Sequence, residues 1–341
     1  MDAYTRGRLG LIACDSGKPF AEKVAAELKE IIAKEDKMNG VDLLKTKETR
    51  FANSELKTEI EESIRNKDIY IFQDIANHSS GLSVNDNFMV LKTAIQAAKM
   101  ADAHYITIII PTFPYSRQDK PKTREGITAA MAARELEDCG AARVITLDIH
   151  NEAIAGFFRK ANLENLRASK NLIDYIKEKI GVKNLVIVAP DVGAAERAVH
   201  YAKKLGTPVA LIHKERDYSK VSTVENMRLV GDVKGKDVCI IDDMIDTAGT
   251  LANAAKKLKD EGAKEIYFAA SLAFFNGPAI DRLDSAYKSK LITKVIGTDA
   301  VYKPVDFKAK HPWYDEVSVA KYFARVIYSI NRGHSISRLL E

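Results

Sequence analysis

The sequence predicts an α/β protein built from two doubly wound domains. Three observations support this: the length of 341 residues, the alternation of short apolar runs with amphipathic stretches, and the occurrence of that alternation twice. A chain of this length exceeds one usual domain, and strand–helix alternation is typical of βαβ units with a parallel sheet. We therefore expect two similar domains at 1–160 and 161–341, each a mainly parallel sheet flanked by helices.

In the first half, four apolar runs predict strands and three amphipathic stretches predict the helices between them. The strands are RLGLIAC (8–14), IYIFQ (69–73), YITIIIP (105–111) and RVITLDIH (143–150), and the helices lie near 18–35, 84–101 and 127–139. The polar segment 159–168 predicts a crossover to the second half. Because no long Pro/Gly/Ser linker follows, we expect the halves to pack closely.

The second half repeats the scheme. NLVIVAP (184–190) precedes a helical pattern at 194–205, PVALIHK (208–214) follows, and DVCIIDD (237–243) leads into TLANAAKKLKDEG (250–262) and EIYFAAS (265–271). The polar, poorly periodic segment 214–226 predicts a mobile loop.

Composition excludes several classes of protein. The 46% hydrophobic and 29% charged fractions are ordinary for a soluble protein. No run reaches the roughly 18 apolar residues of a membrane span, so we expect no membrane partner. The first apolar run resembles a strand more than a secretory segment, which predicts a cytoplasmic protein. Cys14, Cys139 and Cys239 are far apart and lack CxxC spacing, so we expect buried thiols rather than disulfides or zinc.

The charge of the chain favours a small anionic ligand over nucleic acid. Its net charge of +5 arises from 52 basic and 47 acidic residues, a nearly even balance. The densest basic run lies between Arg117 and Arg124 and has no interleaved aromatic platform. We therefore predict no nucleic-acid partner.

The strongest local signal is VCIIDDMIDTAGT at 238–250, an apolar strand that ends in two acids before a tight turn and a helix. Such a turn directs backbone N–H groups and a helix dipole toward one point, which suits a phosphate. The paired acids are placed to accept hydrogen bonds from sugar hydroxyls, so the segment predicts a site for a phosphorylated pentose. An ordinary strand–turn–helix explains Asp246 as an N-cap but leaves the pair unexplained. The candidate residues are Asp242, Asp243, Asp246, Thr247, Ala248, Gly249 and Thr250.

Other polar residues follow predicted strands at the edge where open α/β sheets bind ligands. The RQDK segment, 117–120, can hold a nucleotide there, with a solvated charged loop as the alternative. Asp148, His150 and Asp191 are metal candidates, because Mg²⁺ binds few protein ligands and is completed by phosphate and water. Lys214 and Arg216 are two cations on the predicted mobile loop, where they can neutralise phosphate charge after closure.

The acid-pair segment resembles the phosphoribosyl-pyrophosphate-binding motif that phosphoribosyltransferases share with ribose-phosphate pyrophosphokinases. The rest of the chain discriminates between these families, because further segments resemble pyrophosphokinase signatures in family order. They are RFANSE (50–55), PTFPYSRQDK (111–120), LDIHNEAIAGFF (147–158), APDVGAAER (189–197) and LIHKER (211–216). The resemblance covers essentially the whole chain and is to the phosphate-activated, ADP-inhibited class of that family.

The resemblance implies two phosphoribosyltransferase-type domains and transfer of the pyrophosphoryl group of Mg-ATP to the C1 hydroxyl of ribose 5-phosphate. The products are phosphoribosyl pyrophosphate and AMP. It also implies that Lys214 and Arg216 are catalytic, and that Asp191 joins the acid-pair residues at the ribose 5-phosphate site. His150, Asp191 and Asp148 would bind Mg²⁺. The ATP residues implied are Phe51, Asn53, Glu55, Arg117, Gln118, Asp119 and Lys120.

Regulation and assembly are also implied by the resemblance. Arg124, Ser335 and Ser337 match a regulatory anion site between subunits, where inorganic phosphate would activate and ADP would compete with it. Self-association follows, with dimers building a hexamer, and the C-terminal tail is expected to pack back on the first domain.

Two alternatives stay open from sequence. One is a phosphoribosyltransferase, which consumes phosphoribosyl pyrophosphate and needs only one such domain. The other is a catalytically silent regulatory relative, although His150, Asp191, Lys214 and Arg216 are all present. The chain departs from the family pattern at SLAFFNGPA (271–279), which matches only from Phe275 onward, and across a longer 287–315 stretch.

Overall fold

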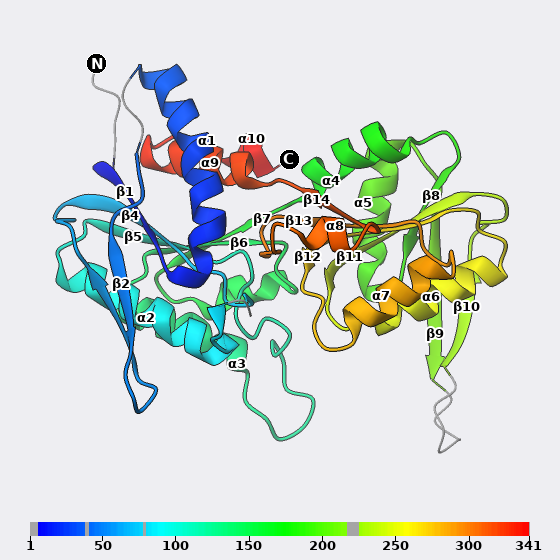
Figure 1. Cartoon of the computed structure of the whole chain (residues 1–341), viewed down its shortest axis with the longest axis horizontal. Coiled ribbons are helices and arrows are strands. Elements are labelled where there is room, and N and C mark those ends of the chain that lie inside the picture. Colours follow the sequence, from blue (N-terminus) through cyan, green and yellow to red (C-terminus); the bar gives the residue numbers. More distant parts are fainter. Residues whose placement is uncertain (1–5, 38–40, 78–79, 217–224, 341) are drawn as a thin grey trace. The chain divides into compact units, whose positions relative to one another are not determined.

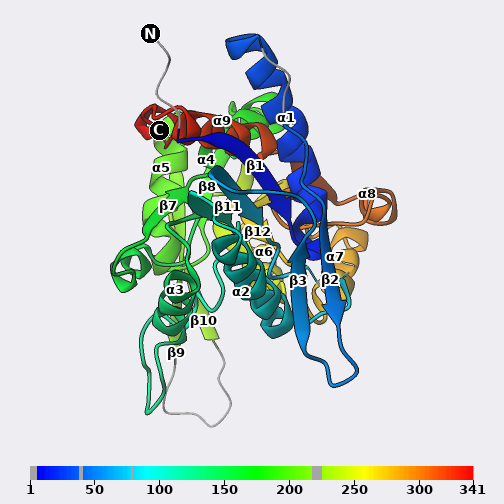
Figure 2. The ribbon, with the colours of Figure 1, turned by 90° about the vertical axis from the view of Figure 1, so that its left-hand side faces the viewer.

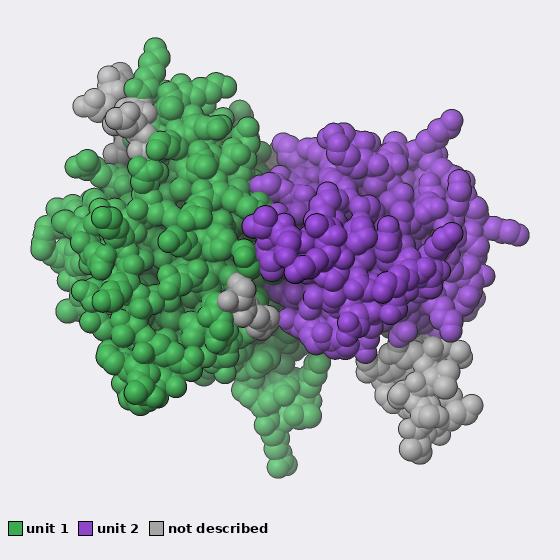
Figure 3. All heavy atoms as spheres, in the orientation of Figure 1, with its two compact units in different colours: residues 1–167, 299–302, 319–341 green, residues 168–298, 303–318 purple. Residues whose placement is uncertain are grey.

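The computed structural model describes residues 6–37, 41–77, 80–216 and 225–340 of the chain (Figure 1). Two compact α/β units are present (Figure 3). Unit 1 comprises residues 1–167, 299–302 and 319–341, and unit 2 comprises residues 168–298 and 303–318. Compared with the expected halves, unit 1 also includes residues 161–167 and the two later segments.

Unit 1 contains a five-stranded sheet in the order β1-β4-β5-β6-β7, and every neighbouring pair is parallel. Its central strands are buried on both faces, as expected for a parallel sheet that helices cover. The strands are β1 (Arg8–Ala13), β4 (Lys67–Phe72), β5 (Tyr105–Ile109), β6 (Arg143–Leu147) and β7 (Asn162–Leu166).

The helices of unit 1 follow the apolar periodicity of the sequence. In the first helix, Phe20, Val24 and Leu28 recur every four residues and are buried on one face. The second helix begins with a capping box between Ser83 and Asp86. The helices are α1 (Lys18–Asp36), α2 (Val84–Met100), α3 (Thr128–Cys139), α9 (Ala320–Asn331) and α10 (Ser337–Leu340), with short turns η1 (Asp15–Gly17) and η3 (Glu152–Phe157).

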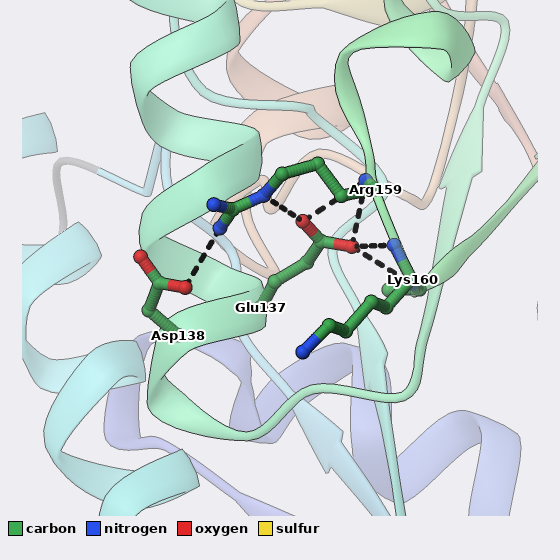
Figure 4. A network of polar contacts seen from close by, with 5 residues as sticks. Glu137, Asp138, Arg159 and Lys160 are labelled. Carbon is green, nitrogen blue, oxygen red and sulfur yellow. Dashed lines mark hydrogen bonds and ion pairs between the residues drawn. The ribbon is translucent and has the colours of Figure 1, made fainter.

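Part of the predicted crossover at 159–168 is a strand, which corrects that prediction. Residues 162–166 form β7, an edge strand that pairs only with β6. An edge strand buries few side chains, so its polar sequence NLENL gave no strand signal. The Glu137 side chain anchors the entry to β7 (Figure 4) by accepting backbone N–H groups from Arg159 and Ala161, among others. Burial alone raises the pKa of Glu137, but these hydrogen bonds lower it below its usual value.

A two-stranded antiparallel hairpin that the sequence reading did not predict lies beside α2 (Figure 2). It consists of β2 (Thr46–Arg50) and β3 (Leu56–Ile60). The hydroxyls of Thr58 and Thr93 lie 2.9 Å apart and join the hairpin to α2. The predicted adenine segment RFANSE therefore occupies the turn of this hairpin.

Unit 2 contains a seven-stranded sheet in the order β10-β9-β8-β11-β12-β13-β14, parallel except for the edge pair β10–β9. Its strands are β8 (Leu185–Ala189), β9 (Val209–Arg216), β10 (Glu225–Val230), β11 (Asp237–Ile245), β12 (Ile266–Ala273), β13 (Lys294–Thr298) and β14 (Tyr314–Val317). Its helical segments are α4 (Ser169–Tyr175), η4 (Ile176–Ile180), η5 (Val192–Ala194), α5 (Ala195–Leu205), α6 (Gly249–Asp260), α7 (Ala279–Lys288) and α8 (Phe307–Lys310).

The 287–315 stretch contributes core to unit 2. It supplies Phe307, Trp313 and Tyr314, whose rings surround that of Phe275 at centroid distances of 5.8, 5.4 and 5.5 Å. Buried aromatic pairs of this kind contribute beyond their area, by about 1 kcal/mol each.

None of the described helices is both long and apolar enough to cross a bilayer. All three cysteines have free thiols, with Cys14 and Cys239 buried and Cys139 partly buried. Burial raises the pKa of Cys14 well above its usual value, as expected for an inert core thiol.

Candidate functional site

The carboxyl end of β11 carries the acid pair and the predicted phosphate turn. Asp243 is buried, with 6% of its surface exposed, while Thr247 and Thr250 are exposed. The helix α6 begins at Gly249, directly after the turn. Ala248 adopts a left-handed conformation with φ of 56°, which costs a residue with a Cβ atom about 1 kcal/mol or more. This turn thus places a strained backbone at the positive end of a helix dipole.

Arg197 of α5 faces both acids. Its Nη1 lies 3.6 Å from Asp242 and 3.9 Å from Asp243. Burial, together with the charge of Asp243, raises the pKa of Asp242 to about 7 despite this arginine. Hydroxyl donors or a cation would stabilise the charged form of these two buried, mutually repelling carboxylates. Sequence reasoning did not single out Arg197, although it ends the quoted APDVGAAER segment.

Asp191 follows β8, the parallel neighbour of β11, and so emerges at the same edge of the unit 2 sheet. Its Oδ1 accepts the Ala194 N–H at 3.1 Å and caps the short turn η5. The structure therefore brings Asp191 and the acid pair to one edge, as the strand ends predicted.

Lys214 and Arg216 belong to β9, which pairs with β10 in a hairpin. Lys214 lies opposite Met227, and Arg216 lies opposite Glu225. The predicted loop 214–226 is therefore strand at both of its ends, which corrects that prediction, and residues 217–224 lie outside the described residues. Because β9 is the parallel neighbour of β8, Lys214 and Arg216 lie at the end of β9 on the same sheet edge as Asp191.

In unit 1, the RQDK segment contacts the segment that follows β6. The Asn151 side chain donates a hydrogen bond to the carboxylate of Asp119, and the Gln118 carbonyl accepts the Ala129 N–H at 3.2 Å. Burial alone would raise the pKa of Asp119, but Asn151 and nearby positive charges, Lys120 included, lower it. The carboxylate of Asp119, a member of the predicted nucleotide segment, therefore stays ionised.

Asp148 and His150 lie within this same part of unit 1. Asp148 is buried at 5% exposure and adopts a φ of 42°, and its N–H donates to the Leu166 carbonyl at 2.8 Å. His150 is exposed. The left-handed backbone at Asp148 lies three residues before Asn151, which contacts RQDK, and backbone strain of this kind clusters at functional sites.

The other residues predicted for ATP occupy the hairpin turn. Phe51 is 48% exposed, and its N–H donates to the Glu55 carbonyl at 2.9 Å. Asn53 accepts the Glu55 N–H through its side chain at 3.1 Å, which shapes the turn. A phenyl ring held open to solvent by a tight turn can stack on a flat base. Adenine binding by Phe51, Asn53 and Glu55 stays a prediction.

The tail serines and Arg124 lie in different places within the chain. Ser335 and Ser337 border a cleft of about 350 Å³ together with Arg6 and Arg143. Their hydroxyl oxygens are 3.3 Å apart. Arg124 is exposed in the loop before α3 and does not line this cleft. In the predicted regulatory site these residues come from different subunits, and the site stays a prediction.

Within the described part of the chain, no group of three or more His, Cys, Asp or Glu is placed to hold a metal ion. His150 belongs to unit 1 and Asp191 to unit 2. The carboxylates of Asp148 and Asp191, each within its own unit, offer the oxygen ligands that Mg²⁺ prefers, and that ion takes most of its other ligands from phosphate and water. The raised pKa of Asp242 also marks an edge of unit 2 where a cation is favourable.

Fold and site together define a class of protein: α/β units of phosphoribosyltransferase type with a phosphate turn after a two-acid strand. The model of the N-terminal domain of ribose phosphate pyrophosphokinase matches residues 9–140, and that of the phosphoribosyl transferase domain matches residues 160–311. The chain belongs to the ribose-phosphate pyrophosphokinase family.

Individual relatives agree along the whole chain. A ribose-phosphate pyrophosphokinase of Chlorobaculum tepidum is 37% identical over 97% of this chain and 94% of its own length. Ribose-phosphate pyrophosphokinase 4 of Saccharomyces cerevisiae is 37% identical over 96% and 94%. The crystal structure of phosphoribosylpyrophosphate synthetase from Mycobacterium smegmatis matches with a TM-score of 0.81 at 33% identity, covering 95% of this chain and 98% of that one.

Proposed function

We propose that this chain transfers the pyrophosphoryl group of Mg-ATP to the C1 hydroxyl of ribose 5-phosphate, giving phosphoribosyl pyrophosphate and AMP. The observation that carries the proposal is the acid pair of β11 followed by the phosphate turn, within a chain related to pyrophosphokinases over nearly its full length. The reaction is an in-line attack on the β-phosphorus of ATP and needs no covalent intermediate.

The sugar phosphate binds at the carboxyl end of β11. The backbone of Thr247 to Thr250, at the start of α6, receives the 5-phosphate, where N–H groups and the helix dipole favour an anion. Asp242 and Asp243 accept hydrogen bonds from the ribose hydroxyls, and Arg197 balances part of their charge. The C1 hydroxyl is thereby held for attack.

The nucleotide binds through unit 1 segments. RQDK binds the triphosphate. The adenine is bound by Phe51, Asn53 and Glu55, which belong either to the same subunit or to a neighbouring one. His150, Asp148 and Asp191 are the residues that would hold Mg²⁺, which when bound would neutralise phosphate charge. Lys214 and Arg216 meet the charge that develops on the transferred group, which is how positioned cations accelerate phosphoryl transfer.

The finer properties belong to the same proposal. The enzyme is cytoplasmic, assembles from dimers into a hexamer, and responds to inorganic phosphate and ADP at a site that includes Arg124, Ser335 and Ser337. An anion that bridges subunits couples them through its higher affinity for one assembled state.

An AMP-release assay tests the proposal against both rivals. With Mg²⁺, ATP and ribose 5-phosphate, the proposed enzyme releases AMP only when both substrates are present. A phosphoribosyltransferase releases no AMP from this mixture but consumes phosphoribosyl pyrophosphate when a base is added. A silent relative does neither, and either of these two patterns would overturn the proposal.

A further inference from the structure

Three successive backbone carbonyls at the start of the phosphate turn are held by the segment that follows β12. This holding segment spans residues 274–282 and includes the start of α7. Its donors are two backbone N–H groups and one side chain, and all three hydrogen bonds are 2.9 Å long. They run from Phe274 N–H to the Ile245 carbonyl, from Asn276 N–H to the Asp246 carbonyl, and from Nη1 of Arg282 to the Thr247 carbonyl.

These bonds fix the direction of the N–H groups on the other side of the turn. The described residues contain no cis peptide bond, and in a trans peptide the C=O and the next N–H point in opposite directions. Holding the carbonyls of Ile245, Asp246 and Thr247 therefore orients the N–H groups of Asp246, Thr247 and Ala248 away from the holding segment. Convergent N–H groups of this kind bind phosphate.

The side chains of the same segment reinforce the arrangement. The Asn276 amide donates to Oδ1 of Asp246 at 3.0 Å, which fixes that carboxylate. A methyl group in place of the Gly249 hydrogen would lie 3.3 Å from Nη1 of Arg282, so the guanidinium sits against the first residue of α6. Arg282 thus brings a positive charge to the turn while holding its backbone.

The holding segment is itself fixed by aromatic packing and by Lys303. Phe275 adopts a φ of 60°, and its ring packs in the aromatic core with Phe307 and Trp313. The Lys303 ammonium donates to the Ala273 carbonyl at the end of β12 and lies 5.1 Å from the Phe275 ring centroid. The strained residue is therefore retained by packing, which keeps the donors of this segment in place.

We infer that Arg282 is a positioning residue for the sugar-phosphate turn and sets the affinity of the enzyme for the phosphate monoester of its sugar substrate. This inference rests on the proposed function. Arg282 acts through the Thr247 carbonyl, which directs the Ala248 N–H toward the phosphate, and its charge adds to the field of the α6 N-terminus. Without Arg282 the 247–248 peptide is free to rotate, and its strained left-handed partner Ala248 relaxes.

The test compares Arg282→Ala, Arg282→Lys and the control Lys288→Ala, which removes an exposed positive charge from the same helix. Arg282→Ala should raise KM for ribose 5-phosphate about tenfold, the scale of one charge-assisted hydrogen bond, with KM for ATP changed by less than about twofold. Arg282→Lys should recover part of the loss, because an ammonium restores the charge and one donor. Lys288→Ala should match the wild type.

Direct titration of ribose 5-phosphate into each protein by calorimetry separates this inference from the proposed function. A wild type that binds the sugar phosphate but forms no AMP would defeat the proposed function, while the ratio of affinities between variants still decides the role of Arg282. An unchanged affinity in Arg282→Ala, or equal losses for ribose 5-phosphate and ATP, would overturn the inference. Thermal midpoints within a few degrees of wild type would confirm that the variants are folded.

Discussion

Asp243 is the more buried member of the acid pair, and its carboxylate lies 3.9 Å from Nη1 of Arg197. We predict that Asp243→Ala weakens the binding of ribose 5-phosphate far more than the binding of ATP, because the substitution removes an acceptor for sugar hydroxyls. The measurement is KM for each substrate, with Asp260→Ala on the exposed end of α6 as the control. Equal losses for both substrates would indicate a metal-binding role instead.

Lys214 tests the charge-neutralising role of β9. We predict that Lys214→Ala lowers kcat roughly a hundredfold with nucleotide affinity largely intact, as is typical when one preorganised electrostatic group is lost. Its interaction is needed mainly in the transition state, so kcat falls more than binding does. Steady-state kinetics with Lys203→Ala of α5 as the control would check this. Near-normal turnover would be incompatible with the role.

At the residue level, the sequence predicted the acid pair and Asp191 at one edge because strand ends of a parallel sheet meet there. It gave no sign of Arg197 or Arg282. Each is one basic residue on an amphipathic helix, and only the tertiary packing of α5 and α7 turns it toward the turn or the acids.

Among the elements, the β2–β3 hairpin is joined to η1 by a carboxylate and to the end of β1 by a hydroxyl. Oε1 of Glu48 accepts the Asp15 N–H at 2.7 Å, and the Thr46 hydroxyl donates to the Ala13 carbonyl at 3.1 Å. Burial, with a contribution from the charge of Asp15, raises the pKa of Glu48 from 4.5 to about 7. The raised pKa places the change in charge of Glu48, on the hairpin that carries Phe51, near neutral pH.

The sign of this effect follows from proton linkage. Between pH 4.5 and about 7 the folded state binds the Glu48 proton more tightly than the unfolded state, so the Glu48 contribution to stability falls as pH rises through that window and is flat above it. We predict that Glu48→Gln flattens this dependence and stabilises the protein at pH 8 by about 1 kcal/mol, allowing for solvent screening. Thermal midpoints from pH 5 to 8 would measure it, and parallel curves for both proteins would contradict it.

Most of the strands and helices that the sequence predicted agree with the structure within two residues, as α1 and α3 illustrate. No helix or strand was predicted for α7, β13 or α9. The hairpin and β7 were also missed. Their sequences, TKETR, LKTEI and NLENL, are polar because each lies at an edge or outside the main sheets, so hydrophobic periodicity carries little signal there.

For the whole molecule, the chain returns to unit 1 twice after building most of unit 2. Asp299 of one returning segment accepts the Val319 N–H of the other at 2.8 Å, and Lys23 of α1 lies 3.3 Å from its second carboxylate oxygen. The α9 helix then packs on α1, where Phe323 meets Phe20 edge to face at 5.1 Å. Local sequence patterns do not encode such long-range pairings, which arise from burial of the α1 and α9 apolar faces together.

We predict that ADP inhibits at a site distinct from catalysis in the assembled enzyme. Hydroxyls from one chain and Arg124 from another would form a charge-assisted anion site for which phosphate and ADP compete. Titrating ADP at saturating ATP should leave inhibition in the wild type and reduce it in Ser335→Ala/Ser337→Ala. Purely competitive inhibition, with identical responses of both proteins to ADP and phosphate, would show that no separate site exists.

The fate of isotope-labelled ATP distinguishes pyrophosphoryl transfer from other reactions of ATP. With ATP carrying ³²P at its β-phosphorus, Mg²⁺ and ribose 5-phosphate, we predict that the label appears in phosphoribosyl pyrophosphate while AMP stays unlabelled. Transfer of the intact pyrophosphoryl group requires the same result with label at the γ-phosphorus. Label from the β-position that accumulates in ADP, or that remains in ATP while no AMP forms, would show that the enzyme does not transfer the pyrophosphoryl group.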